Sequence, residues 1–119
     1  MAAVNAPLRL AFLGCGFITR VHSRILRSFG RDVAVSYASR DAARAEAFTR
    51  QFGGVRSYAE YEAAIDDPSV DAIVIAVPPR YHLPLLLRAL EAGKHVLVEK
   101  PALLTSAEYL AAIAAQLAP

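Results

Sequence analysis

The residues best suited to chemistry near the start of the chain are a pair of glycines. Gly14 and Gly16 follow an apolar run, Leu8 to Leu13, and stand directly before a helical pattern that opens with Phe17-Ile18. Between a strand and a helix, the first glycine permits a tight turn and the second lets the backbone approach a pyrophosphate, which then rests on the helix N-terminus. Thr19 takes the third position of this motif, where Gly or Ala is usual. The spacing predicts a dinucleotide site, and the alternative is a tight turn whose glycines serve geometry alone.

A second set of polar residues ends the next apolar run, Val33 to Ala38. Ser39 and Arg40 follow it at about the distance where a dinucleotide-binding domain holds the adenosine ribose. NAD-dependent proteins usually place Asp or Glu here, whereas Ser39 can hydrogen-bond a 2′-phosphate and Arg40 can neutralise it or stack on adenine. Asp41 comes two residues late and is typical of the N-cap of the next helix. We therefore expect NADP in preference to NAD; the alternative is that Ser39 and Arg40 only begin a helix.

Two further loops are expected beside the same ligand, because ligands bind outside the carboxyl ends of parallel strands. One loop contains Val77, Pro78 and His82, and the other contains Glu99-Lys100. Taken by residue type alone, Glu99-Lys100 is better explained as the charged end of a strand. His82 is equally consistent with a structural cap and with a ligand contact.

The elements that must position these residues alternate along the chain. Apolar runs predict buried parallel strands at Leu8 to Leu13, Val33 to Ala38, Ala72 to Val77 and His95 to Val98, with a weaker strand near Val55–Tyr58. Helical patterns separate these runs, which is the order of βαβ units. The predicted fold class is α/β, a doubly wound parallel sheet of the Rossmann type. It forms one domain over residues 8–119, behind a flexible tail of residues 1–7.

Several helices carry recognisable signals at their ends or along one side. The first helix has one apolar stripe at four-residue steps, formed by Phe17, Val21, Ile25 and Phe29. Gly53-Gly54 marks the end of the second helix. Two capping-box patterns, Ser57 to Glu60 and Thr105 to Glu108, predict helix starts. The second of these is expected to place four apolar residues on the inner face of its helix, namely Tyr109, Leu110, Ile113 and Leu117.

Composition excludes several classes of protein. The 119 residues fit one domain, and a hydrophobic fraction of 55% is enough for a buried core. The net charge of +2 is small and the arginines are scattered, which argues against nucleic-acid binding. No signal peptide and no apolar run of about 20 residues is evident, and the single cysteine, Cys15, suits the cytoplasm. No pair among His22, His82, His95 and Cys15 has metal-ligand spacing, so we expect no metal.

Three stretches give this sequence a close resemblance to the Gfo/Idh/MocA family of oxidoreductases. They are Gly14-Cys-Gly16-Phe-Ile18 with His22, Asp71-Ala-Ile-Val-Ile-Ala-Val-Pro78 with His82, and Ala92-Gly-Lys-His-Val-Leu-Val-Glu99-Lys100-Pro101. The resemblance runs from about Leu8 to Leu117, and the third stretch is its most specific part. The sequence departs from the family at Thr19 and at Pro79, which stands where Asn is common and donates no hydrogen bond.

The resemblance implies an NAD(P)-dependent oxidoreductase acting on CH–OH groups, with sugars, cyclitols and diols as plausible substrates. It implies that Lys100 lies near the nicotinamide and the reacting carbon, where it can orient substrate hydroxyls or assist proton transfer. Glu99 is then expected to fix the loop or contact the ribose, and Pro101 to set the turn through a cis bond. His22 is expected to pack rather than to catalyse.

The same resemblance implies a second domain that supplies the substrate pocket and the main oligomer interface, whereas this sequence stops at Pro119, before a sixth strand. The favoured interpretation is therefore the dinucleotide-binding part of a two-domain oxidoreductase. The alternatives are a stand-alone, non-catalytic binding or sensing module, and a structural protein with a vestigial glycine turn. A strand order of 3-2-1-4-5 would leave His95–Val98 at an open edge, where a second copy of the chain is an expected partner.

Overall fold

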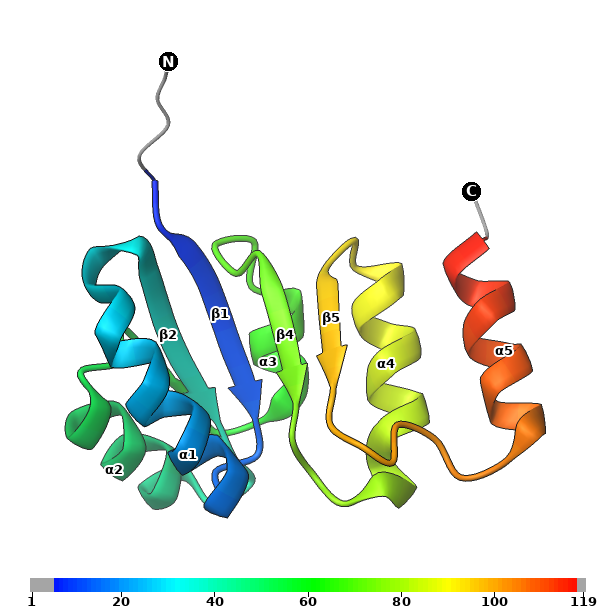
Figure 1. Cartoon of the computed structure of the whole chain (residues 1–119), viewed down its shortest axis with the longest axis horizontal. Coiled ribbons are helices and arrows are strands. Elements are labelled where there is room, and N and C mark those ends of the chain that lie inside the picture. Colours follow the sequence, from blue (N-terminus) through cyan, green and yellow to red (C-terminus); the bar gives the residue numbers. More distant parts are fainter. Residues whose placement is uncertain (1–5, 118–119) are drawn as a thin grey trace.

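The computed structural model describes residues 6–117, in which strands and helices alternate (Figure 1). Residues 1–5 of the predicted tail lie outside the described part. The strands are β1 (Leu8–Leu13), β2 (Val33–Ala38), β3 (Ser57–Tyr58), β4 (Ala72–Ile75) and β5 (His95–Val98). The α-helices are α1 (Phe17–Leu26), α2 (Ala42–Phe52), α3 (Tyr61–Asp66), α4 (His82–Glu91) and α5 (Ser106–Leu117). Short 3₁₀ helices, η1 (Arg27–Asp32) and η2 (Pro79–Tyr81), follow α1 and precede α4.

The five strands form one parallel sheet in the order β3-β2-β1-β4-β5, as the alternation of strands and helices predicts. Leu13, the last residue of β1, is in register with Ala38 of β2 and with Ile75 of β4. Ile75 is in turn in register with Val98 of β5. The carboxyl ends of four strands therefore reach one edge of the sheet together.

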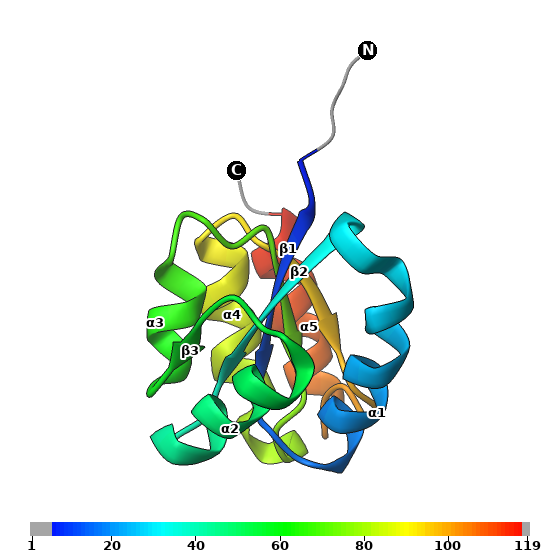
Figure 2. The same cartoon turned by 90° about the vertical axis from the view of Figure 1, so that its left-hand side faces the viewer.

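Helices cover the two faces of the sheet as separate layers (Figure 2). Helices α1 and α2 lie on one face, and α3 and α4 lie on the other, with α5 beside α4. Successive residues of β1 alternate between the two cores, as the two-residue period of a strand requires. Phe12 packs with Tyr37 and Phe48 on the α2 side, whereas Leu13 packs with Ile65 on the α3 side.

The apolar stripe of the first helix is not its buried face, contrary to the usual meaning of such a stripe. Phe17 and Ile25 are 79% and 57% exposed, and Phe29 lies beyond the end of α1, in η1. Thr19 and Ser23 are buried instead. These small side chains let α1 lie close to the sheet, and each has a hydrogen-bond partner there. The Thr19 hydroxyl donates to the Gly14 carbonyl over 2.6 Å, and Ser23 accepts from the Tyr37 hydroxyl over 2.8 Å.

One of the two predicted capping boxes is wrong. Ser57 belongs to the two-residue strand β3, and α3 begins only at Tyr61, after an N-cap residue, Glu60, that makes no side-chain cap. Pairing of β3 with β2 takes Ser57 into the sheet, which outweighs the local capping preference. The second box is confirmed: the Glu108 amide donates to the Thr105 hydroxyl over 3.1 Å, and the Thr105 amide donates to the Glu108 carboxylate.

The apolar side of α5 is also not buried. Tyr109, Leu110, Ile113 and Leu117 are between 46% and 79% exposed, although the sequence predicts them on an inner face. The reason is that the described sheet ends at β5, so α5 packs beside α4 without a strand beneath it. Within residues 6–117, no helix has the length and apolar character needed to cross a membrane.

Candidate functional site

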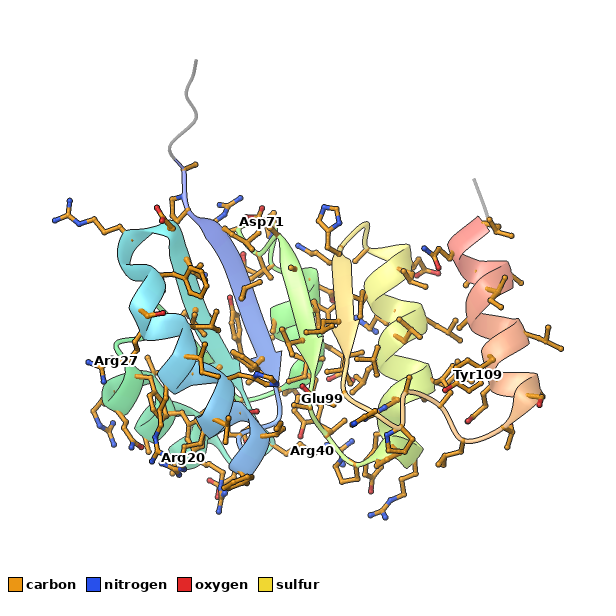
Figure 3. The ribbon with its side chains drawn as sticks, in the orientation of Figure 1. Arg20, Arg27, Arg40, Asp71, Glu99 and Tyr109 are labelled. Atoms are coloured by element: carbon orange, nitrogen blue, oxygen red, sulfur yellow. The ribbon has the colours of Figure 1, made fainter. Side chains whose placement is uncertain are left out.

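The loops that the sequence predicts around one ligand do meet at one edge of the sheet. The first residues after β1, β4 and β5 continue the strand hydrogen bonding: Gly14 N donates to Ala38 O, Ala76 N to Leu13 O, and Glu99 N to Ile75 O, over 2.9 to 3.0 Å. Figure 3 places Arg40 and Glu99 at this edge and Asp71 at the opposite one. The candidate site is therefore assembled from residues 14 to 99 by the sheet itself.

Gly14 is required by the protein's own backbone. It adopts a φ of +105°, a conformation that side chains with a Cβ rarely adopt. A Cβ at this position would also lie 2.6 Å from the carbonyl oxygen of Ala76, in the loop that follows β4. The first glycine of the turn thus lets β1 and β4 end side by side.

Gly16 is different, because the space beside it is open. Its backbone is extended, and a Cβ there would have no protein atom within 4 Å. Gly16 is the N-cap of α1 and provides no side-chain cap, and the first turn of the helix carries no acidic residue. The first amides of α1 therefore face this space without an anionic side chain beside them, as an anion-binding helix N-terminus requires.

The third position of the glycine motif is filled by a buried residue that ties the turn to the helix. Thr19 is fully buried, and its hydroxyl bond to the Gly14 carbonyl joins the first turn of α1 to the residue that starts the glycine turn. The departure from Gly or Ala at this position therefore leaves the helix close to the strand.

At the end of β2, Ser39 and Arg40 lie at the same edge of the sheet as the glycine turn. The Ser39 hydroxyl accepts from the Asp41 amide over 3.0 Å, which leaves its own hydrogen free to donate. The Arg40 guanidinium lies 5.7 Å and 5.5 Å from the ring centres of Tyr61 and Tyr81, so it rests between two aromatic rings. Asp41 caps α2 as predicted, by accepting from the Arg44 amide.

Arg44 is a site residue that sequence reasoning missed. It stands in the first turn of α2, and its guanidinium donates to the carbonyl of Cys15, between the two glycines, over 3.1 Å. Among residues 6–117, neither Arg40 nor Arg44 forms an ion pair with a carboxylate. The position of Arg44 three residues after the helix cap does not indicate this role, because its contact with the turn spans 29 positions.

The buried side chain of His82 holds the loop after β4 in place. The ring of His82 is 1% exposed, and its two nitrogens lie 2.6 Å from the carbonyl oxygen of Val77 and 2.7 Å from that of Ala102. Of the two roles left open for His82, the structural one fits this geometry, because neither nitrogen is free at the surface. His82 joins the loop that contains Val77 and Pro78 to the segment that follows Pro101.

The loop after β5 carries Glu99, Lys100 and Pro101 in the expected place. The Lys100–Pro101 bond is cis, and the Lys100 side chain is exposed at the edge where the strands end. The Glu99 carboxylate is in hydrogen-bond contact with His22 of α1, with 2.6 Å between Oε2 and Nε2. His22 also stacks on Phe12, so it packs as expected and contacts the site as well.

Cys15 is a filler of the turn rather than a nucleophile. The side chain is buried, and burial raises the pKa of its thiol to about 11, so the thiol is protonated at neutral pH. Within residues 6–117, no three His, Cys, Asp or Glu side chains are grouped so that they could hold a metal ion.

Comparisons of this chain with known proteins agree on one protein family. A family model described as "Oxidoreductase family, NAD-binding Rossmann fold" matches residues 8–117. The dTDP-3,4-didehydro-2,6-dideoxy-alpha-D-glucose 3-reductase of Saccharopolyspora spinosa is 35% identical over 106 residues, which are 88% of this chain and 32% of that protein. The inositol 2-dehydrogenase of Corynebacterium glutamicum (strain R) is 38% identical over 100 residues, which are 82% of this chain and 29% of that protein.

A solved structure shows the same architecture. The 3-ketoreductase of Actinomadura kijaniata, in complex with NADP and TDP-benzene, superposes with a TM-score of 0.83 and 32% identity over 92% of this chain and 34% of that one. The chain therefore spans about a third of the length of the relatives that it matches.

Proposed function

This chain belongs to the Gfo/Idh/MocA family of oxidoreductases as its NAD(P)-binding Rossmann domain, and on that premise we propose that it binds NADP(H) in preference to NAD(H). The observation that carries the proposal is the pairing of an open, uncapped helix N-terminus at Gly16 with an end of β2 where Arg40 has no carboxylate partner in residues 6–117 and Asp41 caps α2. The pyrophosphate would rest against the amides of Gly16, Phe17 and Ile18.

We infer the preference for NADP from the residues at the end of β2, where an acidic side chain would select NAD. The one carboxylate that follows β2, that of Asp41, is used as the cap of α2. Ser39 has a hydroxyl hydrogen to donate, and the guanidinium groups of Arg40 and Arg44 have no carboxylate partner in residues 6–117. This set matches the charge and the acceptor oxygens of a 2′-phosphate.

Replacing Arg40 with alanine tests this preference. We expect Arg40→Ala to weaken NADPH binding about tenfold or more, because a hydrogen bond to a charged group contributes about 1.5–3 kcal/mol. Binding of NADH, which has no 2′-phosphate, should change less than about threefold. Isothermal titration calorimetry with both reduced cofactors measures the two dissociation constants.

A matched control is Arg50→Ala, because Arg50 is an exposed arginine in the last turn of the same helix as Arg44. It removes one positive charge without touching the end of β2, and both cofactors should bind it as they bind the unaltered chain. Equal losses for NADPH and NADH in Arg40→Ala would contradict the proposed recognition of the phosphate.

For the whole enzyme, we propose hydride transfer between the bound nicotinamide and a CH–OH or carbonyl carbon of a sugar, cyclitol or diol. The family and the matched reductase and dehydrogenase support this reaction class. Lys100, exposed at the strand edge next to Glu99, is the residue we assign to orienting the substrate hydroxyl or assisting its proton transfer. Substrate contacts would come from a further domain, because this chain spans about a third of its relatives.

We also propose two properties of the protein in its setting. Strand β5 is an edge of the sheet, and Leu97 is 59% exposed on it, which supports pairing of this edge with a second copy or covering of it by the substrate domain. The single, buried cysteine supports a reducing compartment, and we place the protein in the cytoplasm.

A further inference from the structure

The hydrogen-bond contact between His22 and Glu99 joins two parts of the site that are 77 residues apart in the sequence. His22 lies in α1, whose first amides face the proposed pyrophosphate position. Glu99 follows β5 and directly precedes Lys100, on the side of the site proposed for the nicotinamide. Figure 3 shows Glu99 at the edge of the sheet where the strands end.

The surroundings of the pair hold it in one arrangement. The His22 ring is parallel to that of Phe12, with an angle of 18° and 6.2 Å between ring centres, and Phe12 is 1% exposed. An apolar hollow of about 140 Å³ borders the same ring, with Leu97 of β5 on its wall. The side chains of His22 and Glu99 are 36% and 25% exposed, so the contact is partly shielded from water.

Glu99 has no second ion-pair partner among residues 6–117. Its backbone is already placed by the bond from Glu99 N to Ile75 O, so the contact with His22 decides where the carboxylate points. The neighbouring Lys100 ammonium is the nearest alternative along the chain for that carboxylate. In the proposed site, a Glu99 carboxylate held by His22 would leave the Lys100 side chain available for the ligand.

We propose that His22 is a positioning residue that holds the Glu99-Lys100 loop in register with the pyrophosphate turn, and so sets the nicotinamide half of the site. The inference rests on the proposed function, in which Lys100 faces the nicotinamide. The contacts given for His22 are with Glu99 and Phe12, whereas Ser39, Arg40 and Arg44 contact other residues, so the proposal concerns the nicotinamide half of the ligand and not its adenosine half.

The test compares a whole dinucleotide with its adenosine half. The chain and the variants His22→Ala, His22→Gln, Glu99→Gln and His22→Ala/Glu99→Gln are titrated with NADPH and with 2′,5′-ADP, which lacks the nicotinamide. Calorimetry gives both affinities, and the fluorescence of reduced nicotinamide reports how firmly its ring is held. Thermal unfolding shows that each variant is folded.

We expect His22→Ala to weaken NADPH binding about threefold to tenfold and to reduce the fluorescence enhancement, with 2′,5′-ADP affinity changed less than about twofold. The double variant should lose no more than the larger single loss, since both changes break one interaction. His22→Gln, which retains an N–H donor, should recover part of the NADPH affinity.

Three results would overturn the inference while leaving the proposed function in place. They are unchanged NADPH affinity in His22→Ala, equal losses for NADPH and 2′,5′-ADP, and additive losses in the double variant. A chain that bound neither ligand would overturn the proposed function, and the inference with it.

Discussion

At the scale of single residues, the two glycines of the turn have different roles. Gly14 is demanded by the fold, since it combines a φ of +105° with a backbone oxygen 2.6 Å from the position of its missing Cβ. The fold does not require glycine at position 16, because the backbone there is extended and open space lies beside it. Only the second glycine is left for the proposed ligand to explain.

This difference predicts opposite results for two alanine substitutions. Gly14→Ala should lower the free energy of unfolding by about 2–4 kcal/mol, through backbone strain and the clash with Ala76. Gly16→Ala should change it by less than about 1 kcal/mol, since alanine adopts an extended backbone readily. Urea unfolding followed by circular dichroism measures both. A Gly14→Ala variant as stable as the unaltered chain would show that the turn is not held as described.

The sequence predicts a residue's role well where the motif is local. It predicts the role poorly where the residue's partner is distant in the sequence. The glycine turn, the Asp41 cap and the loop ending in Lys100 are local, and each is found where expected. The roles of Arg44 and His22 depend on contacts across 29 and 77 positions. Such contacts exist only once the sheet has brought the strand ends together, so no spacing in the sequence could reveal them.

At the scale of elements, apolar runs predicted strands well because parallel strands are buried on both faces. Helix faces were predicted less well. In α1 the buried positions are Thr19 and Ser23, which hydrophobicity alone places outside, because a close approach to the sheet favours small side chains with hydrogen-bond partners. In the same way, pairing with β2 took Ser57 out of its capping box.

The open edge at β5 predicts self-association. An unpaired strand edge with exposed apolar residues is a template for pairing with another chain, and a charged side chain weakens such pairing. We expect the chain to self-associate at concentrations of about 100 µM, which corresponds to a weak association. Leu97→Lys should shift this equilibrium toward the monomer. Size-exclusion chromatography with light scattering measures the mass of each.

Phe29→Lys is the matched control, because Phe29 is 52% exposed in η1, away from β5. This variant should associate like the unaltered chain. A chain that stayed monomeric at all concentrations would contradict the prediction for the β5 edge.

At the scale of the whole molecule, the chain is the NAD(P)-binding Rossmann domain of an oxidoreductase family and spans about a third of the length of its relatives. The candidate cofactor site lies where four strands end, beside the first helix and the segments that follow β1, β2, β4 and β5. Hydride transfer also requires a substrate held against the nicotinamide. Exposed apolar side chains lie on α1, β5 and α5, and β5 is the outermost strand of the described sheet.

The central claim is that a dinucleotide binds with its pyrophosphate against Gly16 at the start of α1. Calorimetric titration of NADPH into the chain and into Gly16→Ala tests it most directly, because the added methyl group enters the open space beside Gly16. The account predicts saturable binding at one site per chain, weakened about tenfold or more in Gly16→Ala at unchanged stability. No binding to the unaltered chain, or equal binding to both, would contradict it.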